Sequence, residues 1–178
     1  QESGRYNVPF IPKYLPDVKA VLVHLFRREI GIVAAPGNPL GIAGIEDIAG
    51  KKVRFVNRQA GSGTRILLDH HIGRLGIPST DIEGYDREVY THVEVGLTLL
   101  SGEADAGIAT VAVSRLMGLH FIPVTRENFD MVLGQSTYFS KGIQALMEVL
   151  RSPGFRERFE RFGGYGFEDS GKILYSNI

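Results

Sequence analysis

One segment, residues 58–65, concentrates residue types that hold an anion. Its sequence is Arg-Gln-Ala-Gly-Ser-Gly-Thr-Arg, between a short apolar run at residues 53–56 and an amphipathic helical pattern. Gly61 and Gly63 let the backbone approach a ligand closely. Ser62 is a typical N-cap residue, and the amides that follow an N-cap lack partners within the helix. Such a helix N-terminus, together with its dipole, favours an anion.

The charges around this loop point the same way. Arg65 falls in the first helical turn, where a cation is unfavourable by up to about 1 kcal/mol unless an anion is bound. Arg58 precedes the loop, and its planar guanidinium is suited to reach the same point. Ser62 and Thr64 add hydroxyl donors. A plain turn followed by an N-cap explains the local pattern about equally well. The segment is neither a Walker A loop nor a dinucleotide fingerprint, because the Lys-Ser/Thr pair and the third glycine are absent.

Three further residues are weaker candidates for the same cleft. Asp105 opens an expected strand and would face the same cleft and orient an arginine, although a solvated or capping carboxylate explains it better. Tyr90 and Thr91 open the next helix, and a simple cap also explains Thr91. No metal-ligand spacing emerges, and Ser62 has neither a nucleophile elbow nor an assignable base. We therefore expect no catalysis, no metal site and no cofactor.

The composition limits the classes of function. The 178 residues carry 20 basic and 20 acidic side chains, so no global field favours nucleic acid or an anionic membrane. The absence of cysteine excludes disulfides and thiolate chemistry. The sequence holds no apolar run long enough to span a membrane. Any positive site must therefore be local.

Strands alternate with helices at α/β spacing, which predicts a mostly parallel sheet flanked by helices. Strands are expected at residues 20–26, 31–35, 53–56, 104–109, 120–124 and 129–133. Helices are expected at residues 44–49, 66–75, 89–101, 114–117, 141–150 and 153–162. The charged residues 27–29 separate the first two strands. Residues 1–19 are expected to be an irregular lead-in, and the tail after Gly164 to be loosely held.

Several segments resemble a known family in the right order over most of residues 4–165. They are Gly4-Arg5-Tyr6-Asn7, Arg28-Glu29-x-Gly31, residues 35–39, 53–59, 61–65 and 102–107, and Phe121-Ile122-Pro123. The chain is similar to the periplasmic-binding-protein-like domain of molybdate- and tungstate-related proteins. That domain also occurs fused to helix-turn-helix regulators and to molybdopterin-biosynthesis proteins.

The resemblance implies an α/β fold of the type II periplasmic-binding-protein class, with two lobes and a ligand cleft. Two strands near residues 31–36 and 120–125 would cross between the lobes. Residues 1–35 would complete lobe 1 and form the first crossing, residues 36–120 would form lobe 2 with the anion loop, and residues 121–178 would return to lobe 1. Lobe 1 is expected to be incomplete in this chain, its missing segment lying upstream or in another chain.

The resemblance also assigns roles to residues of the loop. Tungstate-binding relatives carry an Arg at the same interval before Ser-Gly-Thr, which transfers to Arg58, Ser62 and Thr64. Those relatives often have His where this chain has Arg65. The expected ligand-binding residues are Arg58, Gly61, Ser62, Gly63, Thr64, Arg65, Tyr90, Thr91 and Asp105.

The function expected is non-catalytic binding of a small oxyanion, molybdate or tungstate favoured, for transport or sensing. The alternative is an effector-binding domain of a transcriptional regulator or of a molybdopterin-biosynthesis fusion, with an organic or other anionic ligand. The expected partners are a membrane transporter or a fused DNA-binding domain, with no direct nucleic acid contact from this segment. A regulator or biosynthetic fusion would be cytoplasmic, and a transport component periplasmic or extracytoplasmic.

Overall fold

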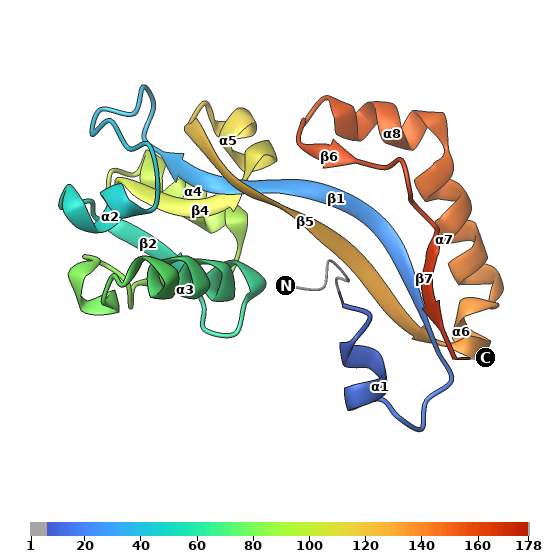
Figure 1. The fold of residues 1–178 in the computed structure, drawn as a ribbon. Coiled ribbons are helices and arrows are strands. Elements are labelled where there is room, and N and C mark those ends of the chain that lie inside the picture. The colour runs from blue at the N-terminus through green and yellow to red at the C-terminus, as the bar shows by residue number, and fades with distance from the viewer. Residues whose placement is uncertain (1–6, 178) are drawn as a thin grey trace. The chain divides into compact units, whose positions relative to one another are not determined.

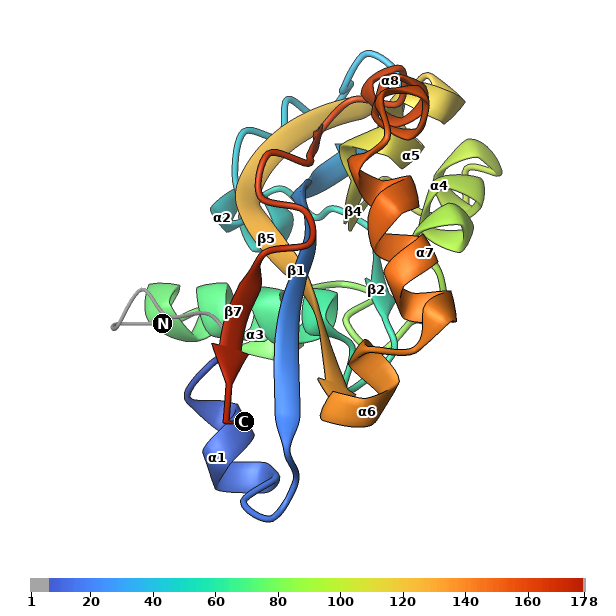
Figure 2. The ribbon, with the colours of Figure 1, turned by 90° about the vertical axis from the view of Figure 1, so that its right-hand side faces the viewer.

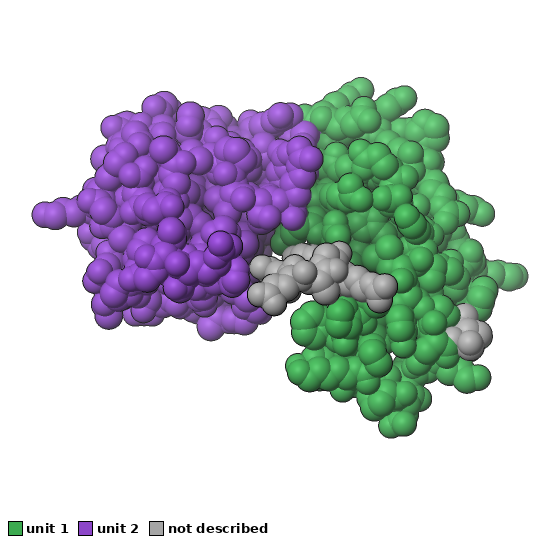
Figure 3. All heavy atoms as spheres, viewed as in Figure 1, with its two compact units in different colours: residues 1–28, 127–161, 165–178 green, residues 29–126, 162–164 purple. Residues whose placement is uncertain are grey.

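A computed structural model describes residues 7–177 of the chain. It divides into two compact units, coloured in Figure 3. Unit 1 is built from the residues up to Arg28, from Glu127–Arg161 and from the residues after Gly164. Unit 2 comprises Glu29–Arg126 together with Phe162–Gly164. Within the described residues, no helix is both long and apolar enough to cross a membrane.

Two long strands, β1 (Ala20–Ala34) and β5 (His120–Gly134), run side by side in the sheet (Figure 1). The sequence predicted two short strands in place of each, which is wrong. Two of the charged residues that suggested an interruption, Arg28 and Glu29, are paired with opposite charges on β5. Arg28 forms an ion pair with Glu127, and Arg126 forms one with Glu29 at 2.9 Å between Nη2 and Oε1. Opposite charges on paired strands stabilise the pairing, so the strands continue through the charged residues.

The sheet of unit 2 has mixed strand directions. Its order is β3-β2-β4-β1-β5, with β2 at Phe55–Arg58, β3 at Glu88–Val89 and β4 at Ala106–Thr110. β2 pairs in parallel with both β3 and β4, whereas β1 pairs antiparallel with β4. The expected mostly parallel sheet is therefore confined to the three strands beside the anion loop.

Helices cover both faces of the sheet in unit 2 (Figure 1). Side chains of a strand alternate between faces, and accordingly Phe55 packs into one apolar cluster and its neighbour Val56 into the other. The cluster around Phe55 includes α2 (Glu46–Gly50) and α3 (Gly63–Leu75). The cluster around Val56 includes α4 (His92–Leu100) and α5 (Val111–Met117). A 3-10 turn, η1 (Ser79–Asp81), follows α3. The predicted helices and buried strands of this region are confirmed.

Unit 1 contains elements that the sequence did not predict. The lead-in holds the short helix α1 (Phe10–Tyr14), whose Ile11 is buried against β1 residues. The tail is not loosely held, since β6 (Tyr165–Gly166) and β7 (Ile173–Ser176) both pair with β1. Figure 2 shows β7 beside β1. The remaining helices are α6 (Gln135–Tyr138), α7 (Lys141–Arg151) and α8 (Pro153–Glu160). α7 buries Met147 and Leu150 against β1.

Candidate functional site

The carboxyl ends of β2 and β3 bring two loops together. The strands are parallel, with Asn57 opposite Glu88 and Arg58 opposite Val89. The chain leaves β2 through the loop to α3, and it leaves β3 through two residues to α4. The N-termini of both helices therefore follow the same edge of the sheet, which is where open α/β sheets bind ligands.

The N-terminus of α3 has the geometry of an anion-binding turn. Ser62 is its N-cap, as the sequence indicated, and its Oγ accepts a hydrogen bond from the Arg65 amide at 3.2 Å. Gly61 has a φ of +84°, a conformation that favours glycine. The amides of Gly63 and Thr64 occupy the first two helical positions, ahead of the hydrogen-bond ladder of the helix. The first turn of α3 contains no acidic residue.

The N-terminus of α4 is satisfied differently. Thr91 is its N-cap, and its Oγ1 accepts a hydrogen bond from the Glu94 amide at 3.0 Å. In return Glu94 Oε2 accepts from the amides of Tyr90 at 2.6 Å and Thr91 at 3.0 Å. This is a capping box, in which a side-chain carboxylate takes the place of an external anion. The geometry of Thr91 is that of the simple cap which the sequence left open as an alternative.

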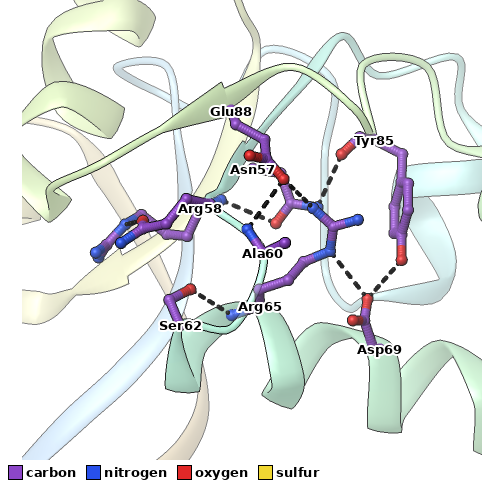
Figure 4. Close-up of polar contacts among 9 residues, drawn as sticks. Asn57, Arg58, Ala60, Ser62, Arg65, Asp69, Tyr85 and Glu88 are labelled. Carbon is purple, nitrogen blue, oxygen red and sulfur yellow. Dashed lines mark hydrogen bonds and ion pairs between the residues drawn. The ribbon is translucent and has the colours of Figure 1, made fainter.

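Arg58 connects the loop after β2 with the loop after β3. Its Nη2 donates to the Tyr90 carbonyl oxygen at 2.6 Å, and its Nε donates to Gln59 Oε1 at 3.2 Å. The Tyr90 residue is 70% exposed. Figure 4 shows Arg58 on the same side of the loop as Ser62. A positive charge and an exposed ring thus lie beside the open turn of α3.

Arg65 has a different environment from the one expected. Its side chain is only 9% exposed, and its guanidinium lies over the Tyr85 ring at 3.9 Å from the centroid. Nε donates to Asp69 Oδ1 at 3.2 Å, and Nη1 donates to Glu88 Oε1 at 3.1 Å (Figure 4). Burial opposes the charge, but Tyr85 and Asp69 outweigh it, so the pKa of Arg65 is raised. The structure therefore sets this guanidinium among side chains of the protein, behind the loop.

Asp105 is not brought to the loop. It directly precedes β4, at the amino ends of β2 and β4, whereas the loop lies at their carboxyl ends. Its arginine partner is Arg54, whose Nε donates to Oδ2 at 3.0 Å. This hydrogen bond holds the pKa of Asp105 below its ordinary value. The expectation that Asp105 faces the same cleft as the loop is therefore wrong, because a residue that opens a parallel strand lies at the opposite edge from one that closes it.

Sequence reasoning missed four residues around the loop. Two had a readable signal: Glu94 lies three residues after Thr91 in a capping-box pattern, and Asp69 lies one helical turn after Arg65. Glu88 and Tyr85 had none, because their contacts with Arg65 depend on tertiary structure.

Two other features of the described residues lie outside this site. A surface pocket of about 330 Å³ lies at the other end of α3, beside His71, Arg74 and Leu75, and contains no predicted site residue. No cluster of three or more potential metal-ligating side chains was found among residues 7–177.

The relatives of the chain define its class. A family model described as the PBP superfamily domain matches residues 1–151, and the chain belongs to this family. It is a periplasmic-binding-protein-like ligand-binding domain, and the predicted type II fold class is confirmed. The uncharacterized protein YvgK of Bacillus subtilis (strain 168) is 31% identical over 173 residues, which is 97% of this chain and 56% of YvgK. The chain thus spans little more than half the length of that relative.

Three solved structures share the fold. PEB3 of Campylobacter jejuni bound to L-phospholactate has a TM-score of 0.55, 23% identity, and coverage of 89% of this chain and 74% of PEB3. A substrate-binding domain assigned to a molybdenum ABC transporter of Clostridium difficile has a TM-score of 0.56 and 17% identity, and the match covers 92% of this chain and 73% of that domain. The regulatory domain of Synechocystis CcmR in complex with 2-PG has a TM-score of 0.57 and 14% identity, and the match covers 75% of this chain and 66% of that domain. Small-ligand binding is common to these proteins, in transport and in regulation.

Proposed function

We propose that unit 2 binds a small oxyanion at the N-terminus of α3, without catalysis, for transport or sensing. The observation that carries the proposal is the contrast between two neighbouring helix N-termini. Glu94 occupies the amides before α4, whereas the first turn of α3 has no carboxylate and is flanked by Arg58. An anion at α3 would supply the negative charge that Glu94 supplies at the N-terminus of α4.

The donors at this turn suit a tetrahedral oxyanion. The amides of Gly63 and Thr64 point along the helix axis toward the ligand, and the helix dipole adds a partial positive charge. Ser62 Oγ accepts from the Arg65 amide, so its own hydrogen is available to donate to the anion. Arg58 adds a full charge. Molybdate or tungstate is the favoured ligand, in line with the likeness to the Clostridium difficile domain assigned to molybdenum transport.

Calorimetric titration with molybdate, tungstate, sulfate and phosphate tests this proposal. We expect saturable binding of at least one anion and the tightest binding for molybdate or tungstate. The Arg74→Ala variant is the control for the place of binding. It removes a positive charge at the far end of α3 and should leave the affinity at the parent value. Absence of heat with all four anions, under conditions where thermal unfolding shows the protein folded, would contradict the proposal.

An effector-binding role with an organic anion is the second candidate. The exposed Tyr90 ring beside Arg58 offers a surface on which the carbon skeleton of such a ligand can pack. The similar structures of PEB3 and CcmR hold L-phospholactate and 2-PG, respectively. Adding L-phospholactate to the titration separates the two. Tighter binding of L-phospholactate than of any inorganic anion, lost in Tyr90→Ala, would favour the effector role.

A further inference from the structure

Glu88 occupies an unusual position behind the loop. It lies on β3 and about a third of its side chain is exposed. Its Oε1 accepts two hydrogen bonds, one from the Ala60 amide at 3.0 Å and one from Arg65 Nη1 at 3.1 Å. Ala60 directly precedes Gly61, the residue with positive φ in the loop. A single carboxylate oxygen thus joins the loop backbone to a side chain of α3.

Arg65 in turn is held by two other residues. Tyr85 lies under its guanidinium and donates its hydroxyl to Asp69 Oδ1 at 2.7 Å, and the same oxygen accepts from Arg65 Nε. Arg65 is therefore fixed on several sides, and it fixes the direction of the Glu88 carboxylate. The loop is tied at Ala60 to β3, and at Ser62 to α3.

From this geometry we propose that Glu88 is a positioning residue of the anion site and that Arg65 acts through it. The inference rests on the proposed function of the α3 N-terminus. Glu88 holds the Ala60 amide, which sets the backbone of Gly61 and Ser62 before any ligand arrives. A preorganised loop binds more tightly than one that must be ordered on binding.

When the Glu88 side chain is removed, this role predicts weaker anion binding, whereas simple electrostatics predicts tighter binding. A carboxylate near the site repels an anion, so loss of its charge alone would tighten anion binding. Loss of its hydrogen bond to Ala60 would loosen the loop and weaken binding. Glu88→Gln removes the charge but keeps an oxygen that can accept from Ala60, whereas Glu88→Ala removes both. The two substitutions therefore separate the two effects.

The experiment is calorimetric titration of the parent, Glu88→Gln and Glu88→Ala with molybdate, tungstate, sulfate and phosphate. We expect Glu88→Gln to bind at least as tightly as the parent, and Glu88→Ala to bind about tenfold more weakly, as for loss of one hydrogen bond to a charged group. The matched control, Glu103→Ala, removes an equal charge paired with Arg87 at the other edge of the sheet and should keep the parent affinity. Parent-like or tighter binding by both Glu88 variants, or an equal loss in Glu103→Ala, would overturn the proposal.

Hydrogen exchange at the Ala60 amide, followed by NMR, tests the positioning role without any ligand. We expect faster exchange in Glu88→Ala than in the parent, with Glu88→Gln between them and the α3 core amides unchanged. Equal exchange at Ala60 in all three proteins would overturn the positioning role even if anions bind. If no anion binds the parent, the proposed function fails while this measurement still decides whether Glu88 holds the loop.

Discussion

Gly63 offers a direct test of the open turn, because a side chain there meets nothing within 4 Å of its Cβ. Gly63→Asp places a carboxylate in the first turn of α3, and Gly63→Ala makes the same backbone change without the charge. Relative to Gly63→Ala, the aspartate should raise the free energy of unfolding without ligand by about 0.3–1 kcal/mol, through the helix N-terminal charge effect.

The same aspartate should weaken anion binding. Two unit charges about 4 Å apart in a water-like medium repel by roughly 1 kcal/mol. A dianion would therefore lose about 2 kcal/mol, which is roughly thirty-fold in affinity. Stability and binding thus change in opposite directions at Gly63.

Urea unfolding and calorimetry at one low ionic strength measure the two effects, and added salt should reduce both. If Gly63→Asp bound anions as tightly as Gly63→Ala, the anion could not lie at the N-terminus of α3. If the aspartate variant were the less stable of the two without ligand, the amides of the turn would not be open to a negative charge.

Three further predictions concern single residues. Arg58→Ala should weaken anion binding at least about tenfold, because a charge-assisted hydrogen bond is lost, and calorimetry measures this. Parent-like affinity would remove Arg58 from the site. Gly31→Ala should lower the free energy of unfolding by about 2 kcal/mol, because the new Cβ would overlap the Ile122 carbonyl oxygen. Urea unfolding measures this change, and unchanged stability would contradict the close approach of β1 and β5. Asp105→Asn should reduce the decline of folding stability at acid pH.

The pH dependence of stability that Asp105 contributes follows from its lowered pKa in the folded state. A carboxylate with a lowered pKa stabilises the fold above its unfolded pKa, and this stabilisation is lost as the pH falls through the folded value. The loss falls below about pH 4. Thermal unfolding between pH 7 and pH 2.5 should show a steeper decline for the parent than for Asp105→Asn. Parallel curves would mean that the ion pair with Arg54 contributes nothing to stability.

Local sequence was enough to identify the strand, loop and helix around residues 53–75. The N-cap at Ser62 and the end of the helix at Gly76 depend on neighbouring residues in the chain, and both are found in the structure. The same holds for Thr91, whose partner Glu94 is three residues away. Such features are predictable because their physical causes lie within one helical turn.

The errors concern partners that are distant in the sequence. The charged residues at 27–29 suggested a break, because the opposite charges at residues 126 and 127 that pair with Glu29 and Arg28 are almost a hundred positions away. The side-chain partners of Arg65 were missed, because Glu88 and Tyr85 come to it only through the pairing of β2 with β3. Asp105 is a different case: its place before the strand already put it at the wrong edge of the sheet.

The pairing of Glu29 with Arg126 also bears on protein engineering. These residues begin and end the continuous stretch of unit 2, and their side chains meet at 2.9 Å. A segment whose two ends lie together can be grafted into a surface loop of a host protein, or circularised, with little or no spacer. The stretch 29–126 contains every residue of the candidate site, so it is a compact cassette for transplanting anion recognition into another scaffold.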